Sequence, residues 1–372
     1  MNKFHRNWFE EINYLRAIAI IAVLIIHTTD GVVLVNKLTE MTFTLIYLEE
    51  LSRFAVPMFI FISGFVLHNR YVSDLPMNEF YTKRFLVILL PYIFFSILYN
   101  IIGTFTKHEA IIPHPEFSSL TLNSINSILN FNAAGHFWYI KLILTFYIFY
   151  PIIIAYYETI KKHFGIYTLV TLFLSIVIMY LFGWFVYPLD FTLGSPLRFL
   201  IFFLFGIYVN DNYEQISRNL ERMSLKKVIL LIISIISLPI FSMFFWIDIR
   251  CGTQFTNPIP YYAQLISIST AILNIFIFVF CLYLILYYKP KIRILQEIGE
   301  YSYGIFMVHV IPMILLENYI FPSFSISHTD LEYYVFLFIG MLLPSYYIVK
   351  LMLTNDLTTY IITGKVMSSR KN

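Results

Sequence analysis

The residues Ile12–Val35, INYLRAIAIIAVLIIHTTDGVVLV, form a long apolar run close to the start of the chain. A helix that crosses a hydrocarbon core needs about 20 apolar residues, and this run is long enough. It contains Arg16 and His27, and no small-residue cleavage site follows it. We therefore interpret it as a retained transmembrane helix and not as a signal peptide.

The composition of the whole chain agrees with this first helix. Of the 372 residues, 59% are hydrophobic and 13% are charged, and the mean hydropathy is +0.74. These values exclude a water-soluble enzyme, a disordered tail and a nucleic-acid-binding module. The two cysteines, Cys251 and Cys281, offer neither a disulfide framework nor a metal-ligand spacing, so we expect no metal site.

Apolar windows of membrane length, broken at charged or Asn-, Gly- and Pro-rich connections, predict about ten spans. The predicted spans are Ile12–Val35, Phe54–Asn69, Phe85–Thr104, Phe137–Tyr157, Tyr167–Tyr187, Pro196–Val209, Val228–Ile247, Tyr262–Tyr287, Tyr303–Ile320 and Tyr333–Met352. The expected fold is an all-α, multi-pass protein of the cell membrane with one domain over residues 1–372. The alternative is eight or nine spans with one re-entrant segment.

The positive charges predict the orientation. Most of the 25 Lys and Arg residues fall on one side if ten spans alternate, and cytoplasmic connections collect these residues. Both termini are therefore expected in the cytoplasm. The long polar connection Thr106–His136 then lies outside, where it could line a binding site, and we expect a short helix in it at Ser124–Asn130.

Arg16 and His27 are the candidate functional residues of the first span. They are separated by three turns of a helix, so both project from one face, about 16 Å apart along the axis. Arg16 could clamp phosphates or reach toward lipid headgroups. His27 could act as a proton acceptor or hydrogen bond between helices. Asp30 could hold the His27 ring in one tautomer or be solvated at the helix end.

Two more groups of side chains could bind ligands. Lys83 and Arg84 precede the third span, where they could complete a basic pocket for a diphosphate or serve as ordinary cytoplasmic anchors. His136 and Trp138 open the fourth span, where they could form an aromatic wall for a sugar ring or part of an interfacial aromatic belt.

Three further features lie inside predicted spans. Lys141 and His309 are ionisable residues in the fourth and ninth spans, and both need polar partners there, so they are also candidates for substrate binding. Pro57 and the Ser63-Gly64 pair in the second span predict a bend or a close approach of another helix.

Several short motifs occur in one order along the chain. They are Asn13-Tyr14-Leu15-Arg16-Ala17 followed by His27, Val56-Pro57-Met58-Phe59 with Ser63-Gly64-Phe65, Lys83-Arg84 before Pro91-Tyr92, His136-Phe137-Trp138-Tyr139, and Ser302-Tyr303-Gly304-Ile305-Phe306 with His309. In this order and with these spans, the chain resembles acyltransferase family 3, integral membrane acyltransferases of surface glycans. Around Arg84 to Tyr92 it is also similar to the intercellular adhesin polysaccharide subgroup.

The resemblance implies an O-acyltransferase that uses acetyl-CoA as donor, with no metal. The acceptor would be a hydroxyl of an extracytoplasmic cell-surface polysaccharide or lipid-linked sugar. It further implies that His27 is catalytic and that Arg16 and Arg84 bind the donor. The family commonly has another basic residue three positions after Arg84, where this chain has Val87, so Lys83 could supply that contact. Expected partners are acyl-CoA, the glycan acceptor, membrane lipids and the polysaccharide synthesis machinery, and no nucleic acid.

Two mechanisms and two other classes of protein stay open from the sequence. His27 could remove the proton of a sugar hydroxyl during direct transfer, or it could carry the acyl group as an acyl-imidazole. Interior Arg and His residues would also suit an exporter or flippase of a surface polysaccharide. A membrane protein with a structural role and no catalytic activity is a third interpretation, although it leaves Arg16 unexplained.

Overall fold

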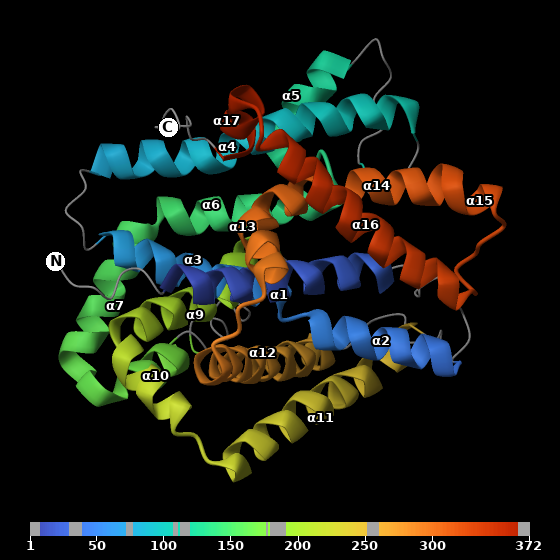
Figure 1. The fold of residues 1–372 in the computed structure, drawn as a ribbon. Coiled ribbons are helices and arrows are strands. Elements are labelled where there is room, and N and C mark those ends of the chain that lie inside the picture. Colours follow the sequence, from blue (N-terminus) through green and yellow to red (C-terminus); the bar gives the residue numbers. More distant parts are fainter. Residues whose placement is uncertain are drawn as a thin grey trace. The chain divides into compact units, whose positions relative to one another are not determined.

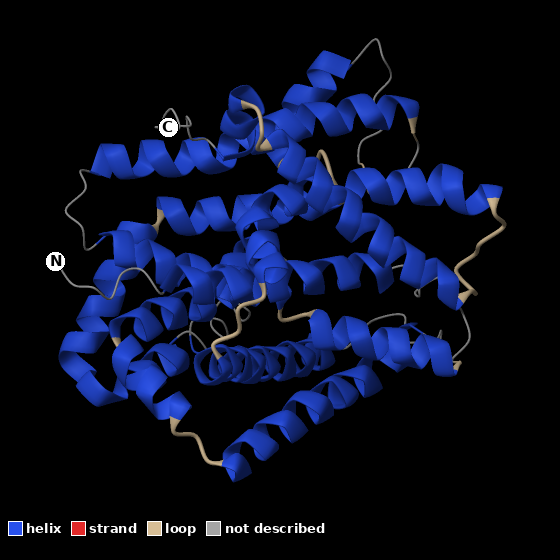
Figure 2. Cartoon of the chain, in the orientation of Figure 1, coloured by secondary structure: helices blue, strands red, loops and turns tan. Residues whose placement is uncertain are grey.

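A computed structural model describes residues 8–29, 39–71, 77–106, 111, 120–175, 178, 191–250 and 260–363. In this part of the chain the regular structure is helical throughout, with short loops and no strand (Figure 2). The all-α prediction is therefore confirmed. The chain divides into two compact units, one of Met1–Ile62 with Asn212–Tyr346 and one of Ser63–Asp211 with Tyr347–Asn372.

The first unit is built around α1 (Trp8–Thr29), which α2, α12 and α13 contact (Figure 1). Its other helices, with their bounds, are α2 (Glu40–Ser52), α10 (Tyr213–Glu221), α11 (Leu225–Arg250), α12 (Pro260–Tyr288), α13 (Arg293–Val308), α14 (Val310–Leu315), a π-helical turn (Leu316–Ile320) and α15 (Phe321–Ser323). Two helices, α3 (Ala55–Tyr71) and α16 (Leu331–Met352), begin in this unit and end in the second.

In the second unit, α4 (Met77–Phe105) contacts α5, α6 and α17, and α6 also contacts α9. The remaining helices of this unit are α5 (Leu120–Asn130), a 3-10 turn (Gly135–Phe137), α6 (Trp138–Ile148), α7 (Tyr150–Phe164), a second 3-10 turn (Gly165–Tyr167), residues 168–175, α9 (Phe191–Asp211) and α17 (Asp356–Thr363). The short helix predicted at Ser124–Asn130 is confirmed as the larger part of α5.

The first helix is the centre of its unit because its sequence allows close packing. It has 22 residues and no Gly or Pro, which gives a length of about 33 Å, enough to cross the bilayer. Ala17 and Ala19 are fully buried, and small side chains let neighbouring membrane helices approach. In α1, 61% of the membrane-length window is buried, against 22% in α11. A larger share of the α1 surface is therefore covered by other parts of the protein than of the α11 surface.

Five helical segments of the described residues are long and apolar enough to cross a membrane. They are Glu10–Thr29, Glu40–His68, Arg84–Phe105, Leu225–Met243 and Leu331–Met352. The number rises to seven if each of two bent helix pairs is one span. The membrane class of the protein follows from these helices, while the predicted number of ten spans and the cytoplasmic termini stay predictions.

The structure corrects the sequence prediction between the first two spans. We expected residues 36–53 to be an external connection, but Glu40–Ser52 forms α2 and joins α3 in one apolar segment. The Thr39 side chain caps the helix by accepting from the Thr42 backbone N–H. The sequence did not predict this helix because its polar residues interrupt the apolar run.

Those polar residues of α2 have buried partners. Arg53 pairs with Glu49 at 2.9 Å and with Glu50 at 2.6 Å. The hydroxyl of Ser242 on α11 donates to Glu50 at 2.7 Å. Buried carboxylates that are paired and hydrogen-bonded can lie inside an apolar helix bundle.

Two predicted spans are bent instead of straight. The span Phe137–Tyr157 is broken at Phe149, where the helices on either side differ in direction by 61°. The span Tyr303–Ile320 is broken at His309, with a bend of 51°. A proline follows each break, Pro151 and Pro312. Proline removes a helical hydrogen bond and its ring clashes with the preceding turn, which explains both bends. Of the span Tyr167–Tyr187, most lies outside the described residues.

Candidate functional site

The first unit brings His27 and His309 together. Their ring centroids lie 5.0 Å apart, with the rings tilted by 44°. His27 is half-buried near the end of α1, and His309 is fully buried at the break between α13 and α14. The sequence indicated both residues separately, and only the folded chain shows that they are neighbours.

The contact between α1 and α13 explains several residues of the first motif. The Tyr14 hydroxyl donates to the Pro290 carbonyl at 2.6 Å and accepts from the Ile292 backbone N–H at 2.9 Å. The Asn13 amide donates to Glu300 at 3.3 Å. These bonds fix the start of α13 against α1, which in turn holds the later part of α13 beside His27.

A glycine lets the two helices approach closely. A Cβ atom on Gly299 would lie 1.9 Å from the Asn13 carbonyl oxygen, so no larger residue fits there without moving the backbone. The Ser63-Gly64 pair does the same in the second unit, where a Cβ on Gly64 would lie 2.1 Å from the Phe203 carbonyl oxygen. The predicted close approach at Gly64 is thus confirmed.

Arg16 lies on the same face of α1 as His27. The helix is unbroken from Trp8 to Thr29, so the two side chains are related by three regular turns, about 16 Å along the axis. Arg16 is half-buried. One helix face therefore carries a permanent cation near the middle of α1 and an imidazole near its C-terminal end.

The second unit has a pocket of about 330 Å³ beside the start of α6. Asn130, Asn132, Trp138 and Lys141 contribute polar or aromatic groups to its wall. The Trp138 side chain is 45% exposed, and Lys141 is also exposed. An exposed indole, two amides and an ammonium group can together bind a polar ring with an acidic substituent.

His136 does not line this pocket. It is buried, with its ring centroid 5.8 Å from that of Tyr99 and 4.5 Å from that of Phe137. The Tyr99 and Phe137 rings belong to the core of the second unit. Of the candidates in the fourth predicted span, Trp138 and Lys141 line the pocket, and His136 lies in the core of the second unit.

The remaining predicted site residues are placed only in part. Arg84 lies on α4 and is half-buried. Lys83 is on the same helix, but its side chain lies outside the described part of the structure. Asp30 lies outside the described residues altogether.

A polar cluster around Asp211, the last residue of α9, was not predicted from the sequence. Its Oδ1 lies 2.8 Å from Nε2 of His68, and its Oδ2 accepts from Tyr157 and from Lys161, both at 2.7 Å. The cluster joins α3, α7 and α9 within the second unit. The available signal was His68, an ionisable residue within the second predicted span.

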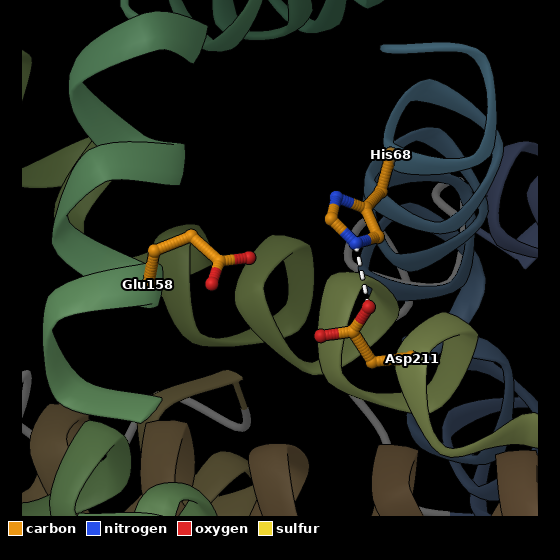
Figure 3. Close-up of side chains that lie close together, drawn as sticks. All are labelled: His68, Glu158 and Asp211. Carbon is orange, nitrogen blue, oxygen red and sulfur yellow. Dashed lines mark hydrogen bonds and ion pairs between the residues drawn. The ribbon is translucent and has the colours of Figure 1, made fainter. Parts of the chain in front are cut away.

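Glu158 completes a group of three possible metal ligands with His68 and Asp211, whose ligand atoms lie within 4.8 Å of one another. Figure 3 shows the Glu158 carboxylate approaching from α7, opposite the His68–Asp211 pair. The Lys161 ammonium group, however, already contacts Asp211. A bound divalent cation would be repelled by that charge, so the cluster is better suited to fixing three helices.

Comparison with known proteins shows the family of the chain. A family profile described as an acyltransferase domain, acyltransferase family 3, matches residues 9–350. The match runs through both compact units. No solved structure matches the chain.

A relative is the "Putative membrane-bound acyltransferase YfiQ" of Bacillus subtilis strain 168. It is 26% identical over 155 residues, which are 41% of this chain and 40% of the relative. The matched region thus spans about two fifths of that protein.

Proposed function

This chain belongs to acyltransferase family 3, and from that premise we propose that it transfers an acyl group from acetyl-CoA to a sugar hydroxyl. The acceptor is a cell-surface polysaccharide or a lipid-linked sugar outside the cytoplasm. The observation that carries the proposal is the single face of α1 on which Arg16 and His27 lie three turns apart.

Arg16 anchors the donor in this proposal. A guanidinium group stays charged and forms paired hydrogen bonds with phosphate oxygens, and coenzyme A carries a diphosphate. With the phosphates at Arg16, the extended pantetheine arm runs along the helix and presents the thioester near His27. Lys83 and Arg84 are proposed as further phosphate ligands because they match the family motif.

His27 acts as general base. Its neutral ring removes the proton from the sugar hydroxyl as the oxygen attacks the thioester carbonyl. The C–S bond then breaks, and the imidazolium returns the proton to the leaving thiolate, so the enzyme ends in its starting state. Holding donor and base on one helix reduces the entropy cost of bringing the reactants together.

The pocket at Trp138 is proposed as a binding site for the acceptor. An indole face can stack on a sugar ring while Asn130 and Asn132 hydrogen bond to its hydroxyls. Replacement of Trp138 by Ala is expected to raise the KM for the glycan by about tenfold and to leave the KM for acetyl-CoA unchanged. Equal KM values for the glycan in both proteins would contradict this role.

The function is tested with purified protein, radiolabelled acetyl-CoA and a glycan acceptor. Wild-type protein should place label in the acceptor, and His27→Ala should not. His163→Ala is the matched control, because His163 is exposed at the end of α7 and should leave transfer intact.

Label in the acceptor with His27→Ala would refute the base assignment. Movement of unlabelled glycan across proteoliposomes, with no transfer of label by the wild-type protein, would favour an exporter instead.

A further inference from the structure

We propose that His309 is a positioning residue for His27. In this proposal Nε2 of His309 accepts a hydrogen bond from one ring nitrogen of His27, which leaves the other nitrogen unprotonated and directed at the acceptor hydroxyl. The inference rests on the proposed function of His27 as base. Its starting point is the pair of rings 5.0 Å apart and tilted by 44°, an arrangement from which a rotation of the His27 side chain would bring one of its nitrogens to Nε2 of His309.

The tautomer of His309 is set by its own helix. Nδ1 of His309 lies 2.8 Å from the Phe306 carbonyl oxygen. A carbonyl oxygen only accepts hydrogen bonds, so Nδ1 must carry a proton. In the neutral ring, Nε2 then has a lone pair and can only accept. A neighbouring imidazole that donates to this nitrogen has its remaining ring nitrogen free for catalysis.

The backbone around His309 makes its position rigid. Pro312 cannot donate the helical hydrogen bond to the Val308 carbonyl, and the helix bends by 51° at His309. The side chain is fully buried. On the other side of the break, α13 is fixed to α1 through Tyr14 and Gly299.

During the reaction the His309 ring keeps its proton and stays neutral. His27 receives the hydroxyl proton on its unprotonated nitrogen and becomes an imidazolium, while its other N–H still donates to Nε2 of His309. The hydrogen bond strengthens as His27 becomes charged, which stabilises the transition state. The proton then leaves with the thiolate, and the pair returns to its first state. The role corresponds to that of an orienting carboxylate in a hydrolase triad, with a neutral acceptor.

Three substitutions of His309 separate positioning from packing. His309→Gln can place an amide oxygen where Nε2 lies, whereas His309→Asn keeps a donor for the Phe306 carbonyl but is too short to reach His27. His309→Leu removes both groups. We expect kcat to fall by less than about tenfold in His309→Gln and by about a hundredfold or more in the other two. The KM for acetyl-CoA should not change, because Arg16 is untouched.

A spectroscopic measurement gives a second readout. In protein labelled with ¹⁵N-histidine, the His27 signals are identified by their loss in His27→Ala. Wild-type protein should show His27 as one neutral tautomer, and His309→Leu should show a mixture of two. His163→Leu is the control for loss of an exposed histidine and should leave the His27 signals unchanged.

The outcomes distinguish this inference from the function it rests on. Full transfer by His27→Ala would end both. An inactive His27→Ala together with a fully active His309→Leu would overturn positioning alone. So would an equal loss of kcat in His309→Gln and His309→Leu, or an unchanged tautomer of His27 in folded His309→Leu. Thermal unfolding of each variant in detergent identifies any that are inactive only because they are unfolded.

Discussion

Two helix pairs of this protein are bent near a proline, and they differ in the burial of the residue at the bend. The chain bends by 61° between α6 and α7 and by 51° between α13 and α14. A proline lies just beyond each break, at Pro151 and Pro312. At the first bend Phe149 is 49% exposed, and at the second His309 is completely buried.

Under the proposed function, only the second of these two bends contributes a side chain to the site. The bend at Phe149 turns an apolar ring outward, and further along α7 the Tyr157 and Lys161 side chains donate to Asp211. The bend at His309 places a polar ring against His27 on α1. A bend can contribute to a catalytic site when it places a titratable side chain against another titratable side chain.

The largest expected effect concerns the packing that holds the second bend in place. Gly299→Ala would put a Cβ atom 1.9 Å from the Asn13 carbonyl oxygen, and backbone atoms cannot move aside cheaply. We expect a loss of at least about 3 kcal/mol in the free energy of unfolding, measured by thermal or denaturant unfolding in detergent.

Gly340→Ala is the matched control for this substitution. Its Cβ would meet the end of the Leu316 side chain, at 2.5 Å, and a flexible side chain can rotate. A loss below about 1 kcal/mol is expected there. Equal losses in the two variants would show that the contact between α1 and α13 is less tight than the structure indicates.

A smaller loss of stability is expected at the end of the first bent pair. Asp211→Ala removes the acceptor of hydrogen bonds from His68, Tyr157 and Lys161. Because His68 is buried and Lys161 is largely exposed, the expected cost is about 2 kcal/mol. Acyl transfer per folded molecule should change less than twofold, as measured by the radiolabel assay with protein quantified after gel filtration. Loss of transfer in folded Asp211→Ala would place this cluster in the catalytic machinery.

The smallest effect tests the two bends directly. Pro312→Ala restores a backbone donor for the Val308 carbonyl, which should reduce the bend and move His309 away from His27. We expect kcat to fall about tenfold, because small errors in the placement of catalytic groups reduce rates strongly. Pro151→Ala makes the same change at the other bend and should leave kcat within about twofold. If both prolines affected kcat alike, the distinction between the bends would be wrong.

Much of the fold could be predicted from the sequence because membrane helices are selected by one physical property. Apolar runs of sufficient length must form helices in lipid, since their backbone groups have no other partners. This argument found α11 and α16 within a few residues at both ends, and it found the greater part of α1 and α4. It missed α2, because the buried Glu49 and Glu50 break its apolar run, and their pairing with Arg53 and Ser242 depends on a neighbouring helix.

The candidate site was predicted in part for a related reason. Arg16 and His27 lie on one helix, and helix geometry alone sets their separation and shared face. Trp138 and Lys141 are likewise one turn apart on α6. The pairing of His27 with His309, by contrast, joins residues that are far apart in the chain, and no local periodicity predicts it.

The all-helical membrane fold, the family and the arrangement of polar residues along α1 could therefore be predicted from the chain's residues alone, because each depends on local pattern and regular helix geometry. Which polar residues meet at each bend follows only from the packing of helices that are far apart in the chain. Such contacts depend on how closely helices pack, and here Gly299 and the hydrogen bonds of Tyr14 hold α13 against α1.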